Sequence, residues 1–489
     1  MLVCLPMTFI SGCRNKEISS LTQMSSSYDL YIFSSKGEIS EQFKELCNEY
    51  EKETGVKIRL QQMGSGTEHK DNLRIQMNSS NSPGIFSLQG LRELHEYNMS
   101  GSVMDLNTAT SPEFKALADA IPQNLRLTTN GENNFGVPYC IEGYGYVVDK
   151  QMIADLIGLD NVDSFIEDMK QASYDEFSGF VKILDEYIKN SKANTFVLNG
   201  NSYNLNPQKV GLATNLTGVF SVSGSEPWTF GDHMMNVALN AVYNSPSDFM
   251  NANDAKVDWL EDAMKKYLKA LDLKTSHAAG DKKGLERGSL FVNSTTNNYN
   301  KAIKRFAEGK ALFIKQGNWI IPNIKSINAE MLDRLVLLPV KMPFSNEDIK
   351  CEGMTAEKFN SSIPVYVPNY FVINSKVSER EQKLAQDFLV WLNTSEVAQK
   401  FVIDKFGFIP YNAKEDLVLE YSINNSILDY LRNNKTLAAV YHGAPESWSK
   451  DTVSMEIMER LLIKKVWSDN DIENLSNWAV QKYKSMRLK

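Results

Sequence analysis

The stretch that decides the fold is residues 28–63, YDLYIFSSKGEISEQFKELCNEYEKETGVKIRLQQM. Leu30 and Ile32 alternate as in a β-strand near its beginning, and Ile58 and Leu60 do so again near its end. Between them, apolar residues recur at steps of four, three and four, on one face of a helix: Ile39, Phe43, Leu46 and Tyr50. Gly55 stands where the C-cap of that helix belongs. The stretch therefore predicts a β-α-β unit with parallel strands and a right-handed crossover.

The same alternation of strand and helix patterns continues along the chain. A polar helix at 71–78 precedes the short strand IFSL, and a further strand pattern, FGVPYCIEGYGYVVDK, ends near Lys150. Helices then dominate until two strand patterns return late, ALFI and VYVPNYFVINS, and the helix EREQKLAQDFLVWLN follows. This order predicts α/β lobes, each a mostly parallel sheet flanked by helices. Because strands return late, we expect the chain to cross between lobes more than once.

Length and composition narrow the class of protein. The chain has 489 residues, of which 42% are hydrophobic and 23% charged, a size and composition typical of a soluble protein with two large lobes. The formal net charge is −8 with no basic blocks, so no nucleic-acid partner is expected. After the N-terminus no apolar run approaches the 18 residues of a membrane-spanning helix.

The N-terminus, MLVCLPMTFISGC, carries an apolar run that is too short to span a bilayer but has the size of a signal-peptide core. Its last four residues, Ile10-Ser11-Gly12-Cys13, resemble the bacterial lipobox, which implies a mature chain acylated at Cys13. We therefore predict a lipoprotein signal peptide over residues 1–13 and a flexible, serine-rich tether over residues 14–27. The alternative is a frayed apolar N-terminus.

Signals of catalysis and metal binding are weak. The five histidines show no HExxH spacing, the cysteines no CxxC pair, and the glycines neither a P-loop nor a complete dinucleotide fingerprint. Glu142 and Asp232 could form a glycosidase pair, but an acid-rich chain offers many such candidates. We expect no enzyme, no cofactor and no metal.

Five segments carry a resemblance to a known family, in the same order along the chain: EYEKETGVKI, SNSPGIFSL, GVPYCIEGYGYVVDK, FAEGKALFIKQGNWIIPNI and FLVWLNTSEVAQKFVIDKFGFIPYN. They resemble the extracellular solute-binding proteins of carbohydrate ABC transporters, the maltose-binding-type family 1. The last two segments are the most specific. The resemblance implies a periplasmic-binding-protein-like fold of type II, in which two α/β lobes joined by a hinge close around a sugar. We expect residues 28–143 and 312–362 in the N-terminal lobe, and residues 144–311 and 363–489 in the C-terminal lobe.

A sugar ring presents C–H patches on its faces and hydroxyls around its rim, so its site needs aromatic side chains and fixed hydrogen-bond partners. Three tryptophans lie in turn-rich segments and are candidates for stacking on a sugar: Trp319, Trp228 and Trp448. The other four, Trp259, Trp391, Trp467 and Trp478, fall in helical patterns and are assigned to packing. In the alternative interpretation each of the three candidates seals a lobe from water.

Polar and aromatic residues near the expected crossovers complete the candidate site. Glu142 could accept bonds from sugar hydroxyls, or it could form a salt bridge with a lysine. The remaining candidates lie beside it, beside Trp319, near the return crossover or in loops: Tyr144, Asn318, Tyr370, Lys36, Asp232 and His233.

The sequence thus predicts the lipid-anchored, sugar-binding component of an ABC importer, held on the outer face of the cell membrane. We expect a monomer that captures an oligosaccharide by hinge closure and delivers it to the permease subunits. Two alternatives stay open at this stage. One is a surface glycosidase or lyase, and the other is a carbohydrate-binding sensor lipoprotein without a transporter.

Overall fold

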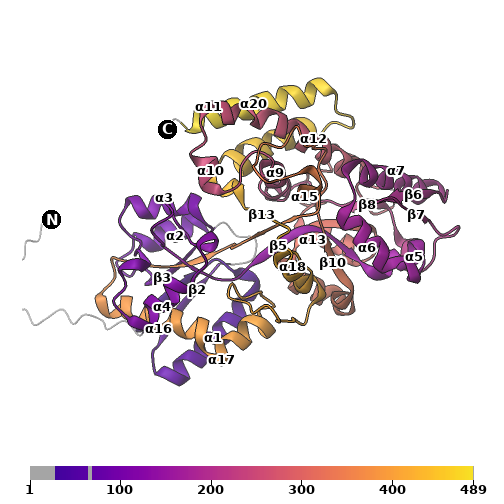
Figure 1. Ribbon diagram of the computed structural model, residues 1–489. Coiled ribbons are helices and arrows are strands. Elements are labelled where there is room, and N and C mark those ends of the chain that lie inside the picture. Colours follow the sequence, from indigo (N-terminus) through magenta and orange to yellow (C-terminus); the bar gives the residue numbers. More distant parts are fainter. Residues whose placement is uncertain (1–27, 64–68, 283, 446, 488–489) are drawn as a thin grey trace, which may run out of the picture.

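The computed structural model describes residues 28–63, 69–282, 284–445 and 447–487. These residues form two main β-sheets, each flanked by helices, in an elongated molecule (Figure 1). The expected two-lobed α/β class is confirmed. The predicted signal peptide, its Cys13 and the tether lie outside the described residues.

The first sheet has the strand order β2-β1-β3-β12-β4. Its strands are β1 (Leu30–Ser34), β2 (Ile58–Gln62), β3 (Ile85–Leu88), β4 (Val137–Pro138) and β12 (Tyr370–Ile373). β1 is parallel to β2 and to β3, while β12 is antiparallel to β3 and β4. Helix α1 (Ser40–Thr54) connects β1 to β2 and ends at Gly55, whose φ of 75° is the left-handed conformation that glycine adopts at a C-cap. The predicted β-α-β unit is therefore present.

The second sheet has the order β13-β11-β5-β9-β8, with β10 also paired to β5. Its strands are β5 (Glu142–Asp149), β8 (Gly218–Ser221), β9 (Ala311–Gly317), β10 (Leu335–Leu338), β11 (Ile363–Tyr366) and β13 (Thr436–Leu437). The central strand β5 is antiparallel to β9, β10 and β11, and only the outer pairs β8–β9 and β11–β13 are parallel. This sheet is therefore mixed rather than mostly parallel, because its strands return from different crossings of the chain.

Strand pairing divides the chain differently from the predicted boundaries. β9 and β10, expected in the N-terminal lobe, pair with β5 in the second sheet. β12, expected in the C-terminal lobe, pairs with β3 and β4 in the first sheet. The chain passes between the sheets at 139–141, at 367–369 and again after Ile409, which pairs with Ile141. A short apolar strand pattern shows that a segment is buried, but tertiary packing decides which sheet it joins.

Helices cover both faces of the first sheet. The orange helices α16 (Glu379–Thr394) and α17 (Glu396–Lys400) lie beside the indigo helix α1, although more than 300 residues separate them in sequence (Figure 1). Tyr50 of α1 fixes this arrangement, because its ring centroid lies 5.1 Å from that of Phe388 and 5.0 Å from that of Trp391. Helix α4 (Pro112–Ala120) packs on α16, and α2 (Lys70–Met77) and α3 (Leu91–Met99) belong to a separate apolar cluster.

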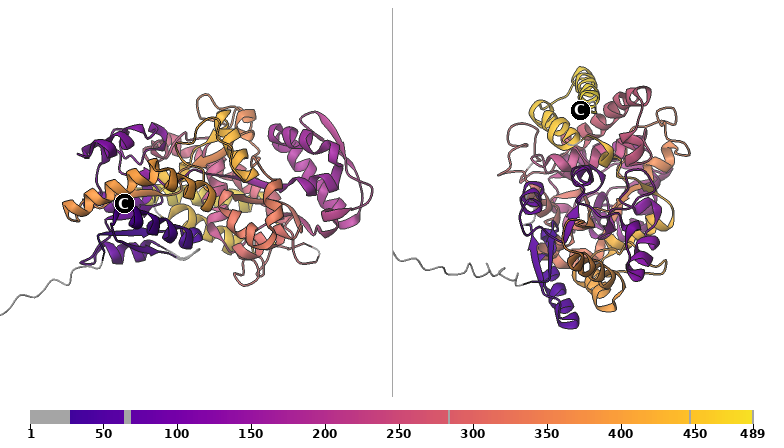
Figure 2. Two further views of the ribbon diagram at one scale, coloured as in Figure 1. Left: turned by 90° about the horizontal axis from the view of Figure 1, so that it is seen from below. Right: turned by 90° about the vertical axis from the view of Figure 1, so that its left-hand side faces the viewer.

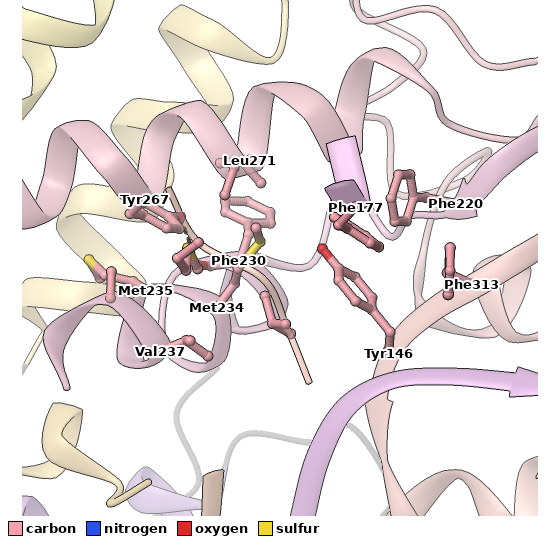
Figure 3. Packing of buried hydrophobic residues seen from close by; sticks show 14 of the residues in the cluster. Tyr146, Phe177, Phe220, Phe230, Met234, Met235, Val237, Tyr267, Leu271 and Phe313 are labelled. Carbon is pink, nitrogen blue, oxygen red and sulfur yellow. Dashed lines mark hydrogen bonds between the residues drawn. The ribbon is translucent and has the colours of Figure 1, made fainter. Parts of the chain in front are cut away.

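The second lobe has the larger core. Tyr146 of β5 contacts Phe177, Phe220 and Phe313, and the residues of α9 and α12 continue this cluster (Figure 3). The longer helices of this lobe are α5 (Lys150–Ile157), α6 (Val162–Gln171), α7 (Tyr174–Asn190), α9 (His233–Leu239), α12 (Leu260–Ser276), α13 (Tyr299–Ala307), α14 (Ile321–Asn328), α18 (Ser422–Arg432) and α20 (Asp469–Arg487). The purple segment with α5, α6 and α7 forms the far end of the molecule (Figure 2).

None of the helices in the described ranges combines the length and apolar composition that crossing a bilayer requires.

Candidate functional site

A cluster of aromatic rings gathers around His233, the first residue of α9. Its imidazole stacks on Tyr144 of β5, with ring centroids 4.5 Å apart and planes 13° from parallel. The centroid of Trp319 lies 5.1 Å from that of His233, and the centroid of Trp228 lies 5.2 Å from it. Trp319 belongs to the single turn η6 (Asn318–Ile320) after β9, and Trp228 to the short helix α8 (Pro227–Phe230). Four candidates from three separate parts of the sequence thus meet.

Three further rings join this cluster that the sequence analysis did not select. Tyr366 at the end of β11 and Tyr441 lie 6.0 and 5.9 Å from His233, centroid to centroid. His442 lies 4.2 Å from Tyr441 and 6.0 Å from Tyr366. Two features of the sequence could have identified them: a tyrosine at the end of a strand pattern, and the turn-rich run YHGAP, in which two rings precede a glycine.

An ion pair joins the first lobe to the start of β5. Nζ of Lys36, which follows β1, lies 2.5 Å from Oε1 of Glu142 and 3.3 Å from Oε1 of Glu38. Both Lys36 and Glu142 are buried, and the hydroxyl of Tyr366 donates to Oε2 of Glu142 over 3.5 Å. Burial disfavours the lysine charge, but the Glu142 carboxylate outweighs it and raises the pKa of Lys36. Of the two roles that the sequence left open for Glu142, the structure shows the salt bridge.

A second polar link between the lobes runs through Arg92, near the start of α3. Its Nη1 lies 3.8 Å from Oδ1 of Asp232 and 3.5 Å from Oγ of Ser449, and Ser449 donates a hydrogen bond to Asp232. The Arg92 guanidinium also lies over the ring of Tyr441, 5.8 Å from its centroid. Asp232 precedes His233, so this link ends beside the aromatic cluster.

Asn236 of α9 holds Tyr144 of the cluster in place by hydrogen bonding. Its side-chain N–H donates to the hydroxyl of Tyr144 and to the carbonyl of Ala438, each over 2.9 Å. His233 itself is buried, and burial, with the charge of Lys315 adding to it, holds the pKa of His233 well below the ordinary value. The imidazole is therefore neutral and can either donate or accept a hydrogen bond.

Two predicted residues, Trp448 and Tyr370, lie apart from these rings. Trp448 is fully buried, packs on Phe249 and Tyr483, and donates its indole N–H to the carbonyl of Ala479. It therefore fills the core of the second lobe. Tyr370 lies in the apolar cluster of the first lobe, in close contact with Gly136.

Asn318 is buried beside Trp319, but its amide is used within the protein. It accepts from the backbone N–H of Gly143 and donates to Asn424. These bonds fix the position of the first residue of η6, so Asn318 positions the neighbouring Trp319.

The arrangement combines broad aromatic faces with fixed, charge-assisted hydrogen-bond partners. Aromatic faces stack on the C–H patches of a ligand ring, and the carboxylates, Lys36 and Arg92 offer partners to polar groups. Lys36 and Gly90 lie two residues after the carboxyl ends of β1 and β3, where ligands bind in open α/β sheets. Within the described ranges, no three side chains of His, Cys, Asp or Glu come together as a metal site.

Comparisons with known proteins agree with this picture. A family model described as bacterial extracellular solute-binding protein matches residues 45–423. No curated protein matches the chain.

Among solved structures, the fold is similar to that of the solute-binding protein RafE in complex with raffinose, with a TM-score of 0.61 and 17% identity over 94% of this chain and 99% of the other. A chitin oligosaccharide binding protein gives a TM-score of 0.60 and 14% identity, over 94% and 99% of the two chains. A Streptococcus pneumoniae solute-binding protein in complex with the blood group A-trisaccharide gives 0.58 and 14%, over 93% and 99%. At these identities the likeness shows the fold.

Proposed function

Since the chain belongs to the bacterial extracellular solute-binding proteins and therefore acts outside the cytoplasm, we propose that its solute is a sugar, in particular an oligosaccharide. In this proposal the protein is the substrate-binding component of an ABC importer. It captures the sugar between its two lobes and presents it to the permease subunits.

The observation that carries the proposal is the ring cluster around His233 together with its two ion pairs. Trp228 and Trp319 supply partly exposed aromatic rings whose centroids lie 6.2 Å apart, and the buried Tyr144 and His233 pack behind them, an arrangement suited to stacking on a sugar. Lys36 with Glu142, and Arg92 with Asp232, place both signs of charge beside those faces. A neutral sugar uses both donors and acceptors, whereas a lone anion would favour donors alone.

Structural relatives support the same ligand class. Those described above are named for raffinose, for chitin oligosaccharides and for a blood group trisaccharide. All three ligands are sugars, and two of them, the chitin oligosaccharide and the trisaccharide, are named as oligosaccharides. The relatives differ among themselves, so they favour the class and leave the particular sugar to experiment.

The proposed mechanism is closure of the two lobes around the ligand. Both ion pairs connect the first lobe to the second, so opening separates Lys36 from Glu142 and Arg92 from Asp232. A sugar that enters while the lobes are apart finds these four groups without their partners. It then stabilises the closed form, because only that form lets it contact both lobes at once.

We further propose that the protein binds its sugar without chemical change. Glu142 and Asp232, the acids that a glycosidase would need, each face a cation of the other lobe. Burial raises the pKa of Glu142 although Lys36 opposes it, but in the closed form this carboxylate is bound to that lysine and does not stand free beside a sugar.

The anchor and the partners complete the proposal. Acylation at Cys13 and the tether over residues 14–27 would hold a monomer on the outer face of the cell membrane, beside its permease. A sensor without a transporter is the alternative, which two permease genes beside this one would disfavour.

Calorimetric titration of the purified protein against malto-, xylo-, chito- and raffinose-type oligosaccharides tests the ligand class. We expect saturable one-to-one binding of at least one of these sugars, with the sugar recovered intact by chromatography. Release of a shorter product would instead support the enzyme. Failure of every sugar to bind would overturn the sugar proposal and leave a solute-binding protein for peptides or charged solutes.

A further inference from the structure

We infer that residues 438–444, here called the end wall, close one end of the candidate site, so that the protein takes the terminus of a sugar chain rather than its middle. The inference rests on the proposed function and adds the mode of binding to it. The end wall lies beyond residues 45–423, the part of the chain that the family model matches. It is therefore a feature of this chain outside the matched region.

The end wall is firmly attached to the second lobe. Asn236 of α9 donates to the carbonyl of Ala438 and accepts from the backbone N–H of Tyr441. Asn240, one turn further along, exchanges two bonds with the backbone of Ala438, each 2.9 Å long. Gly443 lies so close to the carbonyl of Pro246 that a Cβ atom would overlap it. Amide side chains that bind a backbone in both directions fix its position.

The end wall also reaches the first lobe. His442 of the wall lies against Gly90, in the loop between β3 and α3, and a Cβ atom on Gly90 would overlap its Nδ1. Tyr441 of the wall lies under the guanidinium of Arg92, which also approaches Asp232 and Ser449. Tyr441 and His442 are only 5% and 6% exposed. At this side of the cluster the two lobes meet, and a bound chain could not pass between them.

The other side of the cluster is accessible to water. Trp228 and Trp319 are both partly exposed, and their ring centroids lie 6.2 Å apart. His233 contacts both tryptophans and also Tyr441 of the end wall, and so links the exposed tryptophan pair to the buried wall. A sugar chain whose last ring stacks near His233 therefore has one direction in which to continue, past the two tryptophans.

The contact between the end wall and the first lobe can be tested without a sugar. Hydrogen exchange of peptides covering residues 438–444 should become at least fivefold faster in Arg92→Ala than in the wild type, because the variant loses the link across the lobes. The control is Arg74→Ala, which removes an arginine of the same lobe that pairs with Glu96 of that lobe. Unchanged exchange in Arg92→Ala would overturn the end wall as an inter-lobe contact.

The mode of binding is then tested with end-blocked sugars. Each malto-, xylo- or chito-oligosaccharide of three to six units that binds is compared with the same sugar carrying 2-aminobenzamide at its reducing end or a 4-O-methyl group at its non-reducing end. A raffinose-type sugar has no reducing end, so it is compared with versions O-methylated at either its terminal galactose or its fructose. We expect one block to weaken binding at least 30-fold and the other to change it less than threefold. In His442→Ala, the sugar with the disfavoured block should bind with at least a tenth of the affinity that the variant has for the unblocked sugar.

The outcomes separate this inference from the proposed function. Equal tolerance of both blocks, in a protein that binds the unblocked sugar, would overturn the end-binding mode and leave the sugar proposal intact. Binding of none of the sugars would overturn both. In that case the exchange measurement would still show whether the end wall joins the two lobes.

Discussion

Nζ of Lys36 lies 2.5 Å from Oε1 of Glu142, and this pair joins the loop after the first strand of one lobe to the first residue of the central strand of the other. Both groups are buried, so the pair is shielded from water. Removing Glu142 leaves the buried Lys36 with only the partly exposed Glu38, 3.3 Å away, to balance its charge, and breaking a buried pair costs more than the pair itself contributes.

We therefore expect Glu142→Gln to lower the free energy of unfolding by about 3–5 kcal/mol, as measured by urea denaturation. The double variant Lys36→Met with Glu142→Gln should recover part of this loss, because no buried charge then lacks its partner. Glu49→Gln is the control, since its pair with Lys52 is exposed and should contribute less than about 1 kcal/mol. A loss below 1 kcal/mol in Glu142→Gln would contradict the prediction.

Trp319→Ala should weaken binding of an accepted oligosaccharide about 30-fold, or about 2 kcal/mol, because a stacking face in the cluster is lost. Calorimetric titration measures the effect. Trp259→Ala is the matched control, because Trp259 is 42% exposed and lies on the surface. The sugar affinity of this variant should stay within twofold of that of the wild type. Equal affinity in wild type and Trp319→Ala would remove this residue from the site.

Trp448→Ala should act on stability instead. The side chain is fully buried against Phe249 and Tyr483, so its loss should lower the free energy of unfolding by about 3–5 kcal/mol in urea denaturation. Under conditions where the variant is folded, its sugar affinity should change less than threefold. A large loss of affinity with unchanged stability would place Trp448 in the binding site after all.

Stability should fall at mildly acidic pH because of His442. Burial lowers the pKa of His442 to about 3, and the charge of Arg92 adds to this while Glu93 opposes it. An unfolded histidine has a pKa near 6.5, so below that pH the unfolded chain takes up a proton that the folded chain refuses. The contribution is complete above about pH 6.5 and is lost progressively as the pH falls toward 3. At pH 5 the loss is about 2 kcal/mol.

The measurement is the free energy of unfolding at pH 7 and pH 5 for the wild type and His442→Gln. The difference between the two pH values should be smaller by about 2 kcal/mol in the variant. His95→Gln serves as the control, since His95 is exposed on α3 and this variant should keep the wild-type profile. Identical pH dependence in wild type and His442→Gln would show that His442 is not held neutral.

If Cys13 carries the proposed acyl chains, Cys13→Ser should release the protein from the membrane fraction, because those chains can then no longer be attached. Cell fractionation and mass spectrometry of the N-terminal peptide measure this. Cys47→Ser, at a buried free thiol of the folded part, is the control and should stay with the membrane. Retention of Cys13→Ser at the membrane would contradict the lipobox.

The sequence alone determined the fold class and much of the ring cluster. Periodicity identified β1, α1 and β2, because burial of one face imposes a repeat that can be read without knowing the partner. Turn-rich surroundings selected Trp319 and Trp228, and loop position selected Lys36, Asp232 and His233. Trp319 and Trp228 do meet at His233, Asp232 precedes it in the chain, and Lys36 reaches the cluster through Glu142 and Tyr366.

Only the tertiary structure decided which buried segments pair and which rings face the lobe junction. Trp448 and Trp319 both lie in turn-rich sequence, yet one fills a core and the other joins the cluster. The sequence predicts β12 as a strand of the C-terminal lobe, but the strand pairs in the first sheet. Tyr441 and His442 are held at the cluster by hydrogen bonds between their segment and Asn236 and Asn240. The physical reason is that local pattern records how much of a residue is buried, whereas the identity of its neighbours depends on contacts between residues up to several hundred positions apart.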